Sequence, residues 1–406
     1  MDSLITAAAH SLAVGDPVLA LNRIALRDDP PALALRGIAM AQLGDFVRAK
    51  DLLKRAAHAF GLKDPVARAR CLVAEAEIAL VSRDLTWPAK GLEAARVELE
   101  RCGDRVNAAH AGCLAARRLL LVSRLEEAER VLSGIDSAQL SPASRVGYEL
   151  AAAGIAIRRL QTAAARAALA RAEHAAQVAG IPALGAEVES VLLLLTQPTA
   201  RAIARGEERS VTLEEVEALL ASGALVVDAC RNVVWNTGLM VSLATRPVLM
   251  ALARALAEGW PRDVTRDVLV RRAFRAKHAD ESHRARLRVE IGRLRAELGT
   301  LAEVNATDQG FALSPRRASE VVVLAPTVEE QHAAVIALLA DGESWSSSAL
   351  AIALDISPRS VQRALEQLSN AGKVQFFGRG RARRWMTPPV PGFPTTLLLP
   401  GPLPSG

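Results

Sequence analysis

Residues 1–200 repeat one pattern that strongly limits the fold: two amphipathic helices joined by a short polar break, with a period of about 35–40 residues. In the clearest pair, residues 32–45 precede 46–61 and the break is Gly44–Asp45. Apolar residues recur three and four positions apart, as helices require. One pair cannot bury its own apolar face, so pairs must stack on one another. The sequence therefore predicts a helical-repeat array over residues 1–200, with a generic helical bundle as the alternative.

Composition supports a mainly helical chain. Aromatic residues make up only 3% of the 406 residues, whereas Ala and Leu, which are good helix formers, are abundant. The fold class that we predict is mainly α: the N-terminal helical-repeat array is followed by two winged helix-turn-helix domains that carry small β-sheets.

The positive charge is concentrated in two short stretches. The formal net charge is +6, but residues 262–298 carry an excess of basic over acidic side chains, and residues 372–386 contain basic residues and no acid. Such focused charge indicates a polyanionic partner, although a charge run can also be a plain solvated surface.

Signals for an enzyme, a metal or a cofactor are missing from the sequence. The 4 cysteines form no CxxC pair, the 7 histidines are scattered, and no nucleophile elbow or phosphate-binding loop occurs. We expect no enzymatic activity, no cofactor and no metal. The N-terminus has no basic leader and no apolar run reaches membrane-spanning length, so we expect a cytoplasmic protein without a membrane partner.

A second domain is expected over residues 210–318, after a boundary at Pro198 and the charged segment 201–210. Short β-type runs at 224–228, 232–236 and 239–243 precede helical patterns at 245–259, 265–274 and 282–299. A strand–turn–strand pattern follows over 303–315. The sequence therefore predicts strands, three helices and a terminal hairpin.

A third domain is expected over residues 326–390, after a linker at 315–326. Thr327 with Glu330 forms a capping-box pattern, Ser357 before Pro358 marks the start of a helix, and Gly372 marks its end. Residues 373–386 have the pattern of a hairpin with a Gly-Arg turn. Residues 391–406 are rich in proline and are expected to form a flexible tail.

Two short helices at 346–355 and 356–372 predict a helix-turn-helix. Its expected core consists of Leu350, Ala353, Leu354, Ile356, Val361, Leu365 and Leu368. The opposite, early face of the second helix carries Arg359, Ser360, Gln362 and Arg363, where such motifs contact base edges. The hairpin residues Arg379, Arg381, Arg383 and Arg384 are expected at phosphate or in the minor groove.

This third segment resembles the winged helix-turn-helix of bacterial repressors of the GntR and DeoR type. The resemblance implies binding of double-stranded DNA. Use of the segment for protein contacts alone is the alternative.

The second domain resembles the OmpR-type winged helix, with 286–299 similar to its recognition helix and Gly310-Phe311 similar to its wing. The resemblance implies DNA contacts by Arg284, Arg286, Arg288, Glu290, Arg293 and Arg295. Ala285 and Arg288 depart from the family pattern, so a domain used for dimerisation is the alternative. Residues 34–56 resemble a tetratricopeptide repeat, with small residues at Gly37, Ala39 and Ala49.

Together these features predict a bacterial sequence-specific DNA-binding transcriptional regulator. We expect a homodimer, in which the helical array mediates oligomerisation or binds an effector, a protein or a peptide. The alternative is a protein-interaction adaptor whose winged helices are assembly modules. RNA binding is less favoured, because the sequence shows no evident pair of exposed aromatic residues for stacking on unpaired bases.

Overall fold

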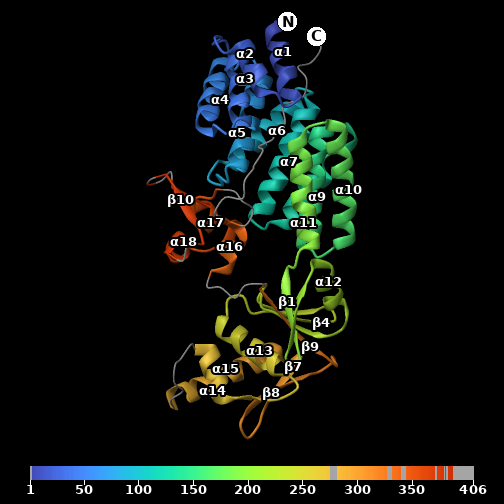
Figure 1. Cartoon of the computed structure of the whole chain (residues 1–406), viewed down its shortest axis with the longest axis vertical. Coiled ribbons are helices and arrows are strands. Elements are labelled where there is room, and N and C mark those ends of the chain that lie inside the picture. The colour runs from blue at the N-terminus through green and yellow to red at the C-terminus, as the bar shows by residue number, and fades with distance from the viewer. Residues whose placement is uncertain are drawn as a thin grey trace. The chain divides into compact units, whose positions relative to one another are not determined.

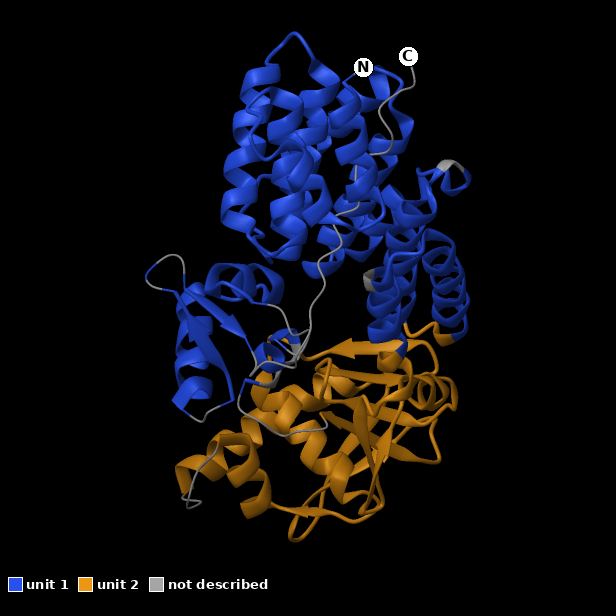
Figure 2. Cartoon of the chain, turned by 45° about the horizontal axis from the view of Figure 1, so that its top comes forward, with its two compact units in different colours: residues 1–159, 163–192, 331–406 blue, residues 160–162, 193–330 orange. Residues whose placement is uncertain are grey.

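The computed structural model describes residues 2–274, 281–326, 332–339, 344–370, 373–378, 380 and 383–386. Helices account for 64% of the structure and the sheets are small, so the mainly α fold class is confirmed (Figure 1). The chain forms two compact units (Figure 2). Unit 1 comprises residues 1–159, 163–192 and 331–406, and unit 2 comprises residues 160–162 and 193–330.

The N-terminal part of the chain is a succession of helices (Figure 1), and from α1 to α9 each helix packs on the next. The helix pairs expected from the sequence are present. The helices are α1 (Ser3–Ala13), α2 (Pro17–Ile24), α3 (Pro30–Gln42), α4 (Phe46–Phe60), α5 (Pro65–Val81), α6 (Ala89–Arg101), α7 (Arg105–Leu121), α8 (Leu125–Ser133), η1 (Ser137–Gln139), α9 (Pro142–Arg158), α10 (Thr162–Ala179) and α11 (Pro182–Thr196).

Aspartate side chains begin many of these helices. Each accepts a hydrogen bond from a backbone N–H of the first turn, which would otherwise have no partner. The residues are Asp2, Asp16, Asp29, Asp45, Asp64 and Asp104. Small residues then permit close packing, because a Cβ at Gly37 would meet Leu53 Cγ at 2.8 Å.

The C-terminal segment (residues 332–386) belongs to unit 1. It contains α16 (Ala333–Leu339), α17 (Ser347–Leu354), α18 (Pro358–Asn370), β10 (Gln375–Phe377) and β11 (Arg384–Met386), which pairs antiparallel with β10. The predicted helix-turn-helix elements and hairpin strands are therefore present. Thr327, Glu330, Gly372 and the tail 391–406 lie outside the described residues.

The core of the C-terminal segment matches the sequence pattern with one exception. Leu350, Val361 and Leu365 are fully buried, and Ala353 and Leu354 pack partly buried against them. The prediction for Ile356 was wrong: it is exposed, because it lies in the turn between α17 and α18 rather than on a helix face that points inward. Leu85, from the turn after α5, completes this core.

Unit 2 contains a six-stranded sheet with the order β2-β1-β9-β3-β4-β5. Its strands are β1 (Ala200–Ala204), β2 (Glu207–Val211), β3 (Leu225–Asp228), β4 (Val233–Asn236), β5 (Leu239–Ser242) and β9 (Val321–Pro326), and α12 (Leu213–Ala221) follows β2. β9 lies antiparallel to β1 and parallel to β3.

Two sequence interpretations fail in this sheet. The expected linker at 315–326 ends in the buried strand β9, and the expected boundary segment 201–210 lies mostly in the β1–β2 hairpin. β9 is a continuous apolar run, which is typical of a strand covered on both faces. The sequence interpretation gave too much weight to Pro315, which ends β8, and to Pro326, which ends β9.

The rest of unit 2 follows the predicted order. It comprises α13 (Pro247–Gly259), β6 (Val264–Thr265), α14 (Arg266–Phe274), α15 (Glu281–Leu298), β7 (Ala302–Ala306) and β8 (Gly310–Pro315). The last two strands form a sheet with β6, in the order β6-β8-β7. Ile291, Leu294 and Leu298 of α15 are buried.

Candidate nucleic-acid interface

Helix α18 begins at a tight turn that fixes its orientation against α17. α17 ends at Asp355 in the left-handed region, with φ of 52°, and the Asp355 backbone N–H donates to the Ala351 carbonyl. The Ser360 backbone N–H donates to Ser357 Oγ at 3.1 Å, so Ser357 is the N-cap. Pro358 then supplies the first helical residue, where its missing N–H costs nothing.

The two faces of α18 differ sharply. Val361, Ala364, Leu365 and Leu368 are buried against the core of the C-terminal segment. On the other face, the four residues predicted to contact bases are all exposed: Arg359, Ser360, Gln362 and Arg363. The helix is therefore held by one face and presents polar side chains on the other.

The exposed arginines of α18 are not paired with an acidic side chain. Within the described part of the chain, Arg359 and Arg363 form no ion pair, while Gln362 Nε2 donates weakly to Glu366 Oε1 at 3.4 Å. Exposed guanidinium and amide groups on one helix face match the paired donors and acceptors of guanine and adenine in the major groove.

The β10–β11 hairpin places further cations beside aromatic rings. The Arg383 guanidinium lies 4.5 Å from the ring centroid of Phe376 and 5.7 Å from that of Trp385. Arg384 lies opposite Phe377 across the two strands. Arg379 and Arg381, also predicted to contact DNA, lie outside the described residues.

Arg384 also contributes to the electrostatics of Asp84, in the turn between α5 and α6. Burial alone raises the pKa of the Asp84 carboxyl. The hydrogen bond from Thr86 and the charges of Lys50 and Arg384 outweigh burial, so the pKa lies below its ordinary value. The carboxyl therefore stays charged at neutral pH.

Helix α15 of unit 2 presents a different picture, because every basic residue predicted to contact DNA there has an intramolecular partner. Arg284 lies 3.6 Å from Asp267, and Arg288 lies 3.6 Å from Glu281. Arg293 forms a 2.9 Å ion pair with Glu290, whose side chain is only 12% exposed. These pairs sit at the protein surface and are weak, but they reduce the net positive charge of this helix.

Two further arginines of α15 are used in packing. Arg286 stacks over Phe274, 4.5 Å from the ring centroid. Arg295 Nε donates to the Val304 carbonyl at 2.6 Å and its guanidinium lies 5.9 Å from the Phe311 ring centroid. Arg286 is nevertheless exposed, whereas Glu290 is partly buried and paired with Arg293.

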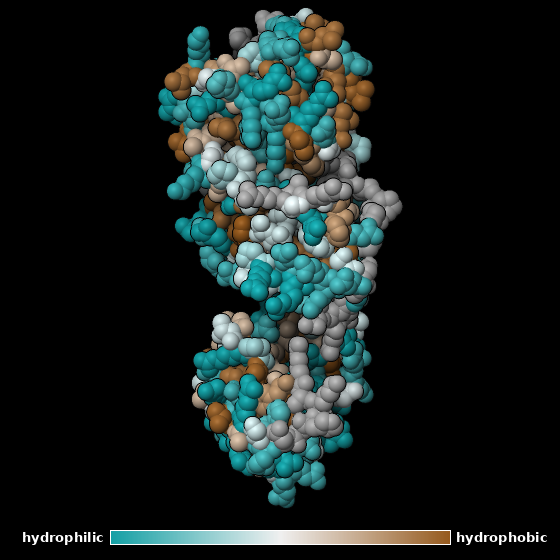
Figure 3. Space-filling view, turned by 90° about the vertical axis from the view of Figure 1, so that its left-hand side faces the viewer, coloured by the Kyte–Doolittle hydropathy of each residue, from teal (hydrophilic) through white to brown (hydrophobic). Residues whose placement is uncertain are grey.

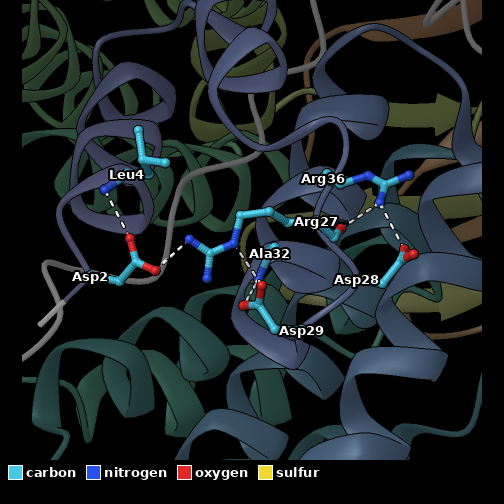
Figure 4. Close-up of polar contacts among 7 residues, drawn as sticks. All are labelled: Asp2, Leu4, Arg27, Asp28, Asp29, Ala32 and Arg36. Carbon is cyan, nitrogen blue, oxygen red and sulfur yellow. Dashed lines mark hydrogen bonds and ion pairs between the residues drawn. The ribbon is translucent and has the colours of Figure 1, made fainter.

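The charged groups at the start of the helical array form an ion-pair network that holds helix ends together (Figure 4). Arg27 pairs with Asp29 at 2.7 Å and also with Asp2, and Arg36 donates to Asp28 at 3.2 Å. The hydrogen bonds from Arg27 lower the pKa values of Asp2 and Asp29. Their capping bonds and ion pairs account for these aspartates without a catalytic role.

Other classes of site find little support in the described part of the chain. It contains no group of three or more His, Cys, Asp or Glu side chains placed to hold a metal ion. Burial raises the pKa of the Cys71 and Cys113 thiols to about 12, so both resist ionisation. The helices searched there include none that is long and apolar enough to cross a bilayer.

The surface of the N-terminal helices offers a less specific candidate for partner binding. Apolar side chains are scattered among hydrophilic ones over these helices (Figure 3). They include Leu26, Val47 and Leu62, each at least 85% exposed. Isolated exposed apolar residues are common on protein surfaces, so this observation defines no particular partner.

One pair of functional candidates was missed by sequence reasoning. Phe376 and Phe377 of β10 are 49% and 52% exposed, which contradicts the expectation that exposed aromatic pairs are absent. The signal was present in the sequence as two adjacent phenylalanines inside a basic segment. A strand pattern alone does not show which aromatic residues enter the core.

Comparisons with protein-family models, with curated proteins and with solved structures gave no match for this chain. Its function must therefore be argued from its own residues.

Proposed function

We propose that this chain is a cytoplasmic, sequence-specific DNA-binding transcriptional regulator of bacterial type. The observation that carries the proposal is α18: a capped helix, buried on one face, with Arg359, Gln362 and Arg363 exposed on the other. Such a helix can enter the major groove, where arginine pairs with guanine and glutamine with adenine.

The hairpin would supply affinity rather than sequence selection. Arg383 and Arg384 follow a basic segment that contains no acid, and cations displace counterions from DNA phosphate. The hairpin holds the backbone of these arginines in place. Their contacts with phosphate would therefore set the orientation of α18 on the duplex. The total affinity should therefore fall as salt rises.

Under this proposal, unit 2 contributes less to base recognition than α18 does. The arginines of α15 that resemble a recognition helix are paired or stacked within the unit. Dimerisation is the role that we assign to unit 2, which would place two copies of α18 on two half-sites. The helical array would bind the effector or partner.

The experiment compares the full chain with the variant Arg359→Ala, Gln362→Ala and Arg363→Ala. Genomic fragments selected by the wild-type protein serve as specific DNA, and a scrambled duplex serves as reference. The variant should lose roughly tenfold or more in preference for specific over scrambled DNA, because each paired base contact contributes about 1–3 kcal/mol.

The matched control removes the same side chains from exposed positions on other helices: Arg48→Ala, Arg105→Ala and Gln177→Ala. It has the same net charge as the test variant and should keep the wild-type preference. Equal preference in all three proteins would remove α18 from base recognition.

The second candidate function is a protein-interaction adaptor. The ion pairs that the arginines of α15 form within unit 2 favour it, because they leave fewer cations for DNA. A hollow of about 460 Å³ beside α13 and α15 is lined by Arg246, Leu249, Glu290 and Arg293, and it could accept a partner side chain. An adaptor predicts that the wild-type chain binds no duplex DNA even at low salt, which the same experiment measures.

A further inference from the structure

The most unusual exposed surface in the described chain is aromatic. Of the aromatic residues whose burial is described, only Phe376 and Phe377 are exposed. They are adjacent in β10, in a chain with only 3% aromatic residues. Exposed aromatic rings lose the favourable burial that drives folding, so two together indicate a surface that something else covers.

The strand geometry separates the two rings. Side chains of successive strand residues point to opposite faces, and residues opposite each other across two strands share a face. Phe376 therefore shares a face with Trp385, 5.1 Å away between ring centroids, and Trp385 is buried in the core. Phe377 lies on the other face with Arg384.

The charge around the rings identifies the kind of occupant. Arg384 lies opposite Phe377 across the two strands, Arg383 lies over Phe376, and the sequence from 372 to 386 contains no acid. Arg383 is positioned by two rings, and its buried Nε has no hydrogen-bond acceptor among the described residues. A half-exposed ring beside cations complements a ligand with a flat face and an anionic backbone.

We propose that this hairpin binds unpaired nucleotides, with Phe377 stacking on a base and Arg384, which lies on the same face, contacting a phosphate. Aromatic side chains on strands contribute to single-strand binding because every base offers a π-face. The surface is distinct from the exposed face of α18 and does not depend on duplex reading. Single-stranded DNA and RNA share this chemistry.

The test uses the full chain and fluorescent oligonucleotides of about 20 nucleotides, longer than a typical single-strand site. DNA and RNA single strands of one sequence, and the corresponding duplex, are titrated by anisotropy at low and moderate salt. The variants are Phe377→Ala, Phe377→Leu and Phe377→Trp. Leucine keeps an apolar side chain without a ring, and tryptophan keeps a ring. Circular dichroism confirms that each variant is folded.

Wild-type protein should bind at least one single strand, and Phe377→Ala and Phe377→Leu should each weaken that binding roughly tenfold, while Phe377→Trp retains it. The DNA and RNA arms then show which strand is preferred. Binding of neither strand, or equal affinity of Phe377→Leu and wild type, would overturn the proposal.

The α18 triple variant separates this proposal from the proposed function. It should lose duplex preference and keep single-strand affinity, whereas Phe377→Leu should do the reverse. A variant that keeps the activity it is expected to lose identifies which of the two proposals fails.

Discussion

Trp345 and Trp385 exchange two backbone hydrogen bonds: Trp345 N donates to Trp385 O at 2.7 Å, and Trp385 N donates to Trp345 O at 2.8 Å. Both side chains are buried. Trp345, which precedes the N-cap Ser346 of α17, is thereby joined to the last strand of the hairpin. This pair ties the hairpin to the two helices, so Arg384 of β11 and the exposed face of α18 keep a fixed relationship.

The first prediction concerns this pair. Trp345→Ala should destabilise the C-terminal segment by about 3–5 kcal/mol, because it empties a fully buried aromatic site. Hydrogen exchange of the whole chain is the measurement, since several units need not unfold together. Amides of α17 and α18 should lose protection while those of unit 2 keep theirs. Wild-type protection in α17 and α18 would contradict it.

The second prediction concerns Gly310, the first residue of β8. A Cβ there would lie 1.8 Å from the Val264 carbonyl oxygen and 2.8 Å from Thr265 Cα. Gly310→Ala should therefore break the β6–β8 pairing and destabilise unit 2 by roughly 2 kcal/mol or more. Loss of hydrogen-exchange protection in β6 and β8 is the readout.

Gly292 in α15 provides the control for Gly310. A Cβ at Gly292 meets nothing within 4 Å. Gly292→Ala should be stabilising by about 1 kcal/mol, because alanine is the better helix former. If both Gly310→Ala and Gly292→Ala were destabilised, or if neither were, the result would contradict the close packing of Gly310 against β6.

Local signals in the sequence were enough to predict most elements. Apolar periodicity predicted the helix pairs, and Ser357 with Pro358 predicted the start of α18. The position of β9 could not be predicted in this way, because its partners β1 and β3 are remote in sequence. Pairing over such a distance depends on tertiary packing rather than local pattern.

The candidate site could be predicted only where local helical spacing determines it. The exposed face of α18 follows from helical spacing alone, since Val361 and Leu365 define its buried side. The partners of the α15 arginines do not follow from spacing. Asp267 and Phe274 lie on another helix, and Val304 lies on a strand, so only the folded structure shows that these cations are engaged.

The third prediction compares the two helices that resemble recognition helices. Arg284→Ala, Arg288→Ala and Arg293→Ala together should lower DNA affinity less than the α18 triple variant, because each residue has an acidic neighbour. Binding is measured on the same specific and scrambled duplexes. A larger loss of sequence preference in the α15 variant would transfer base recognition to unit 2.

Arg295 should behave differently from those three arginines. Its hydrogen bond to Val304 and its position near Phe311 connect α15 to the β7–β8 hairpin. The fourth prediction is therefore that Arg295→Ala reduces the stability of unit 2, by about 1–3 kcal/mol for a lost hydrogen bond from a charged group. Thermal unfolding of Arg295→Ala and Arg288→Ala separates the two roles, because Arg288 pairs only at the surface.

The last prediction concerns Glu75, which is buried in α5. Burial raises the pKa of its carboxyl, and the charges of Lys54 and Lys50 oppose burial without cancelling it. A carboxyl with a raised folded-state pKa destabilises the fold once it ionises. The penalty is therefore absent below the unfolded pKa, near 4.3, grows as the pH rises from there to the folded pKa, and is fully present above it.

Glu75→Gln should remove this penalty and stabilise the helical array at pH 7 by on the order of 1 kcal/mol, and the gain should vanish as the pH approaches about 4. Thermal unfolding of the variant and wild type at several pH values gives the difference directly. Glu126→Gln, at an exposed position in α8, controls for the change in net charge and should show little effect. A constant effect of Glu75→Gln across this pH range would mean that the carboxyl is not destabilised by burial, and would place its role in packing instead.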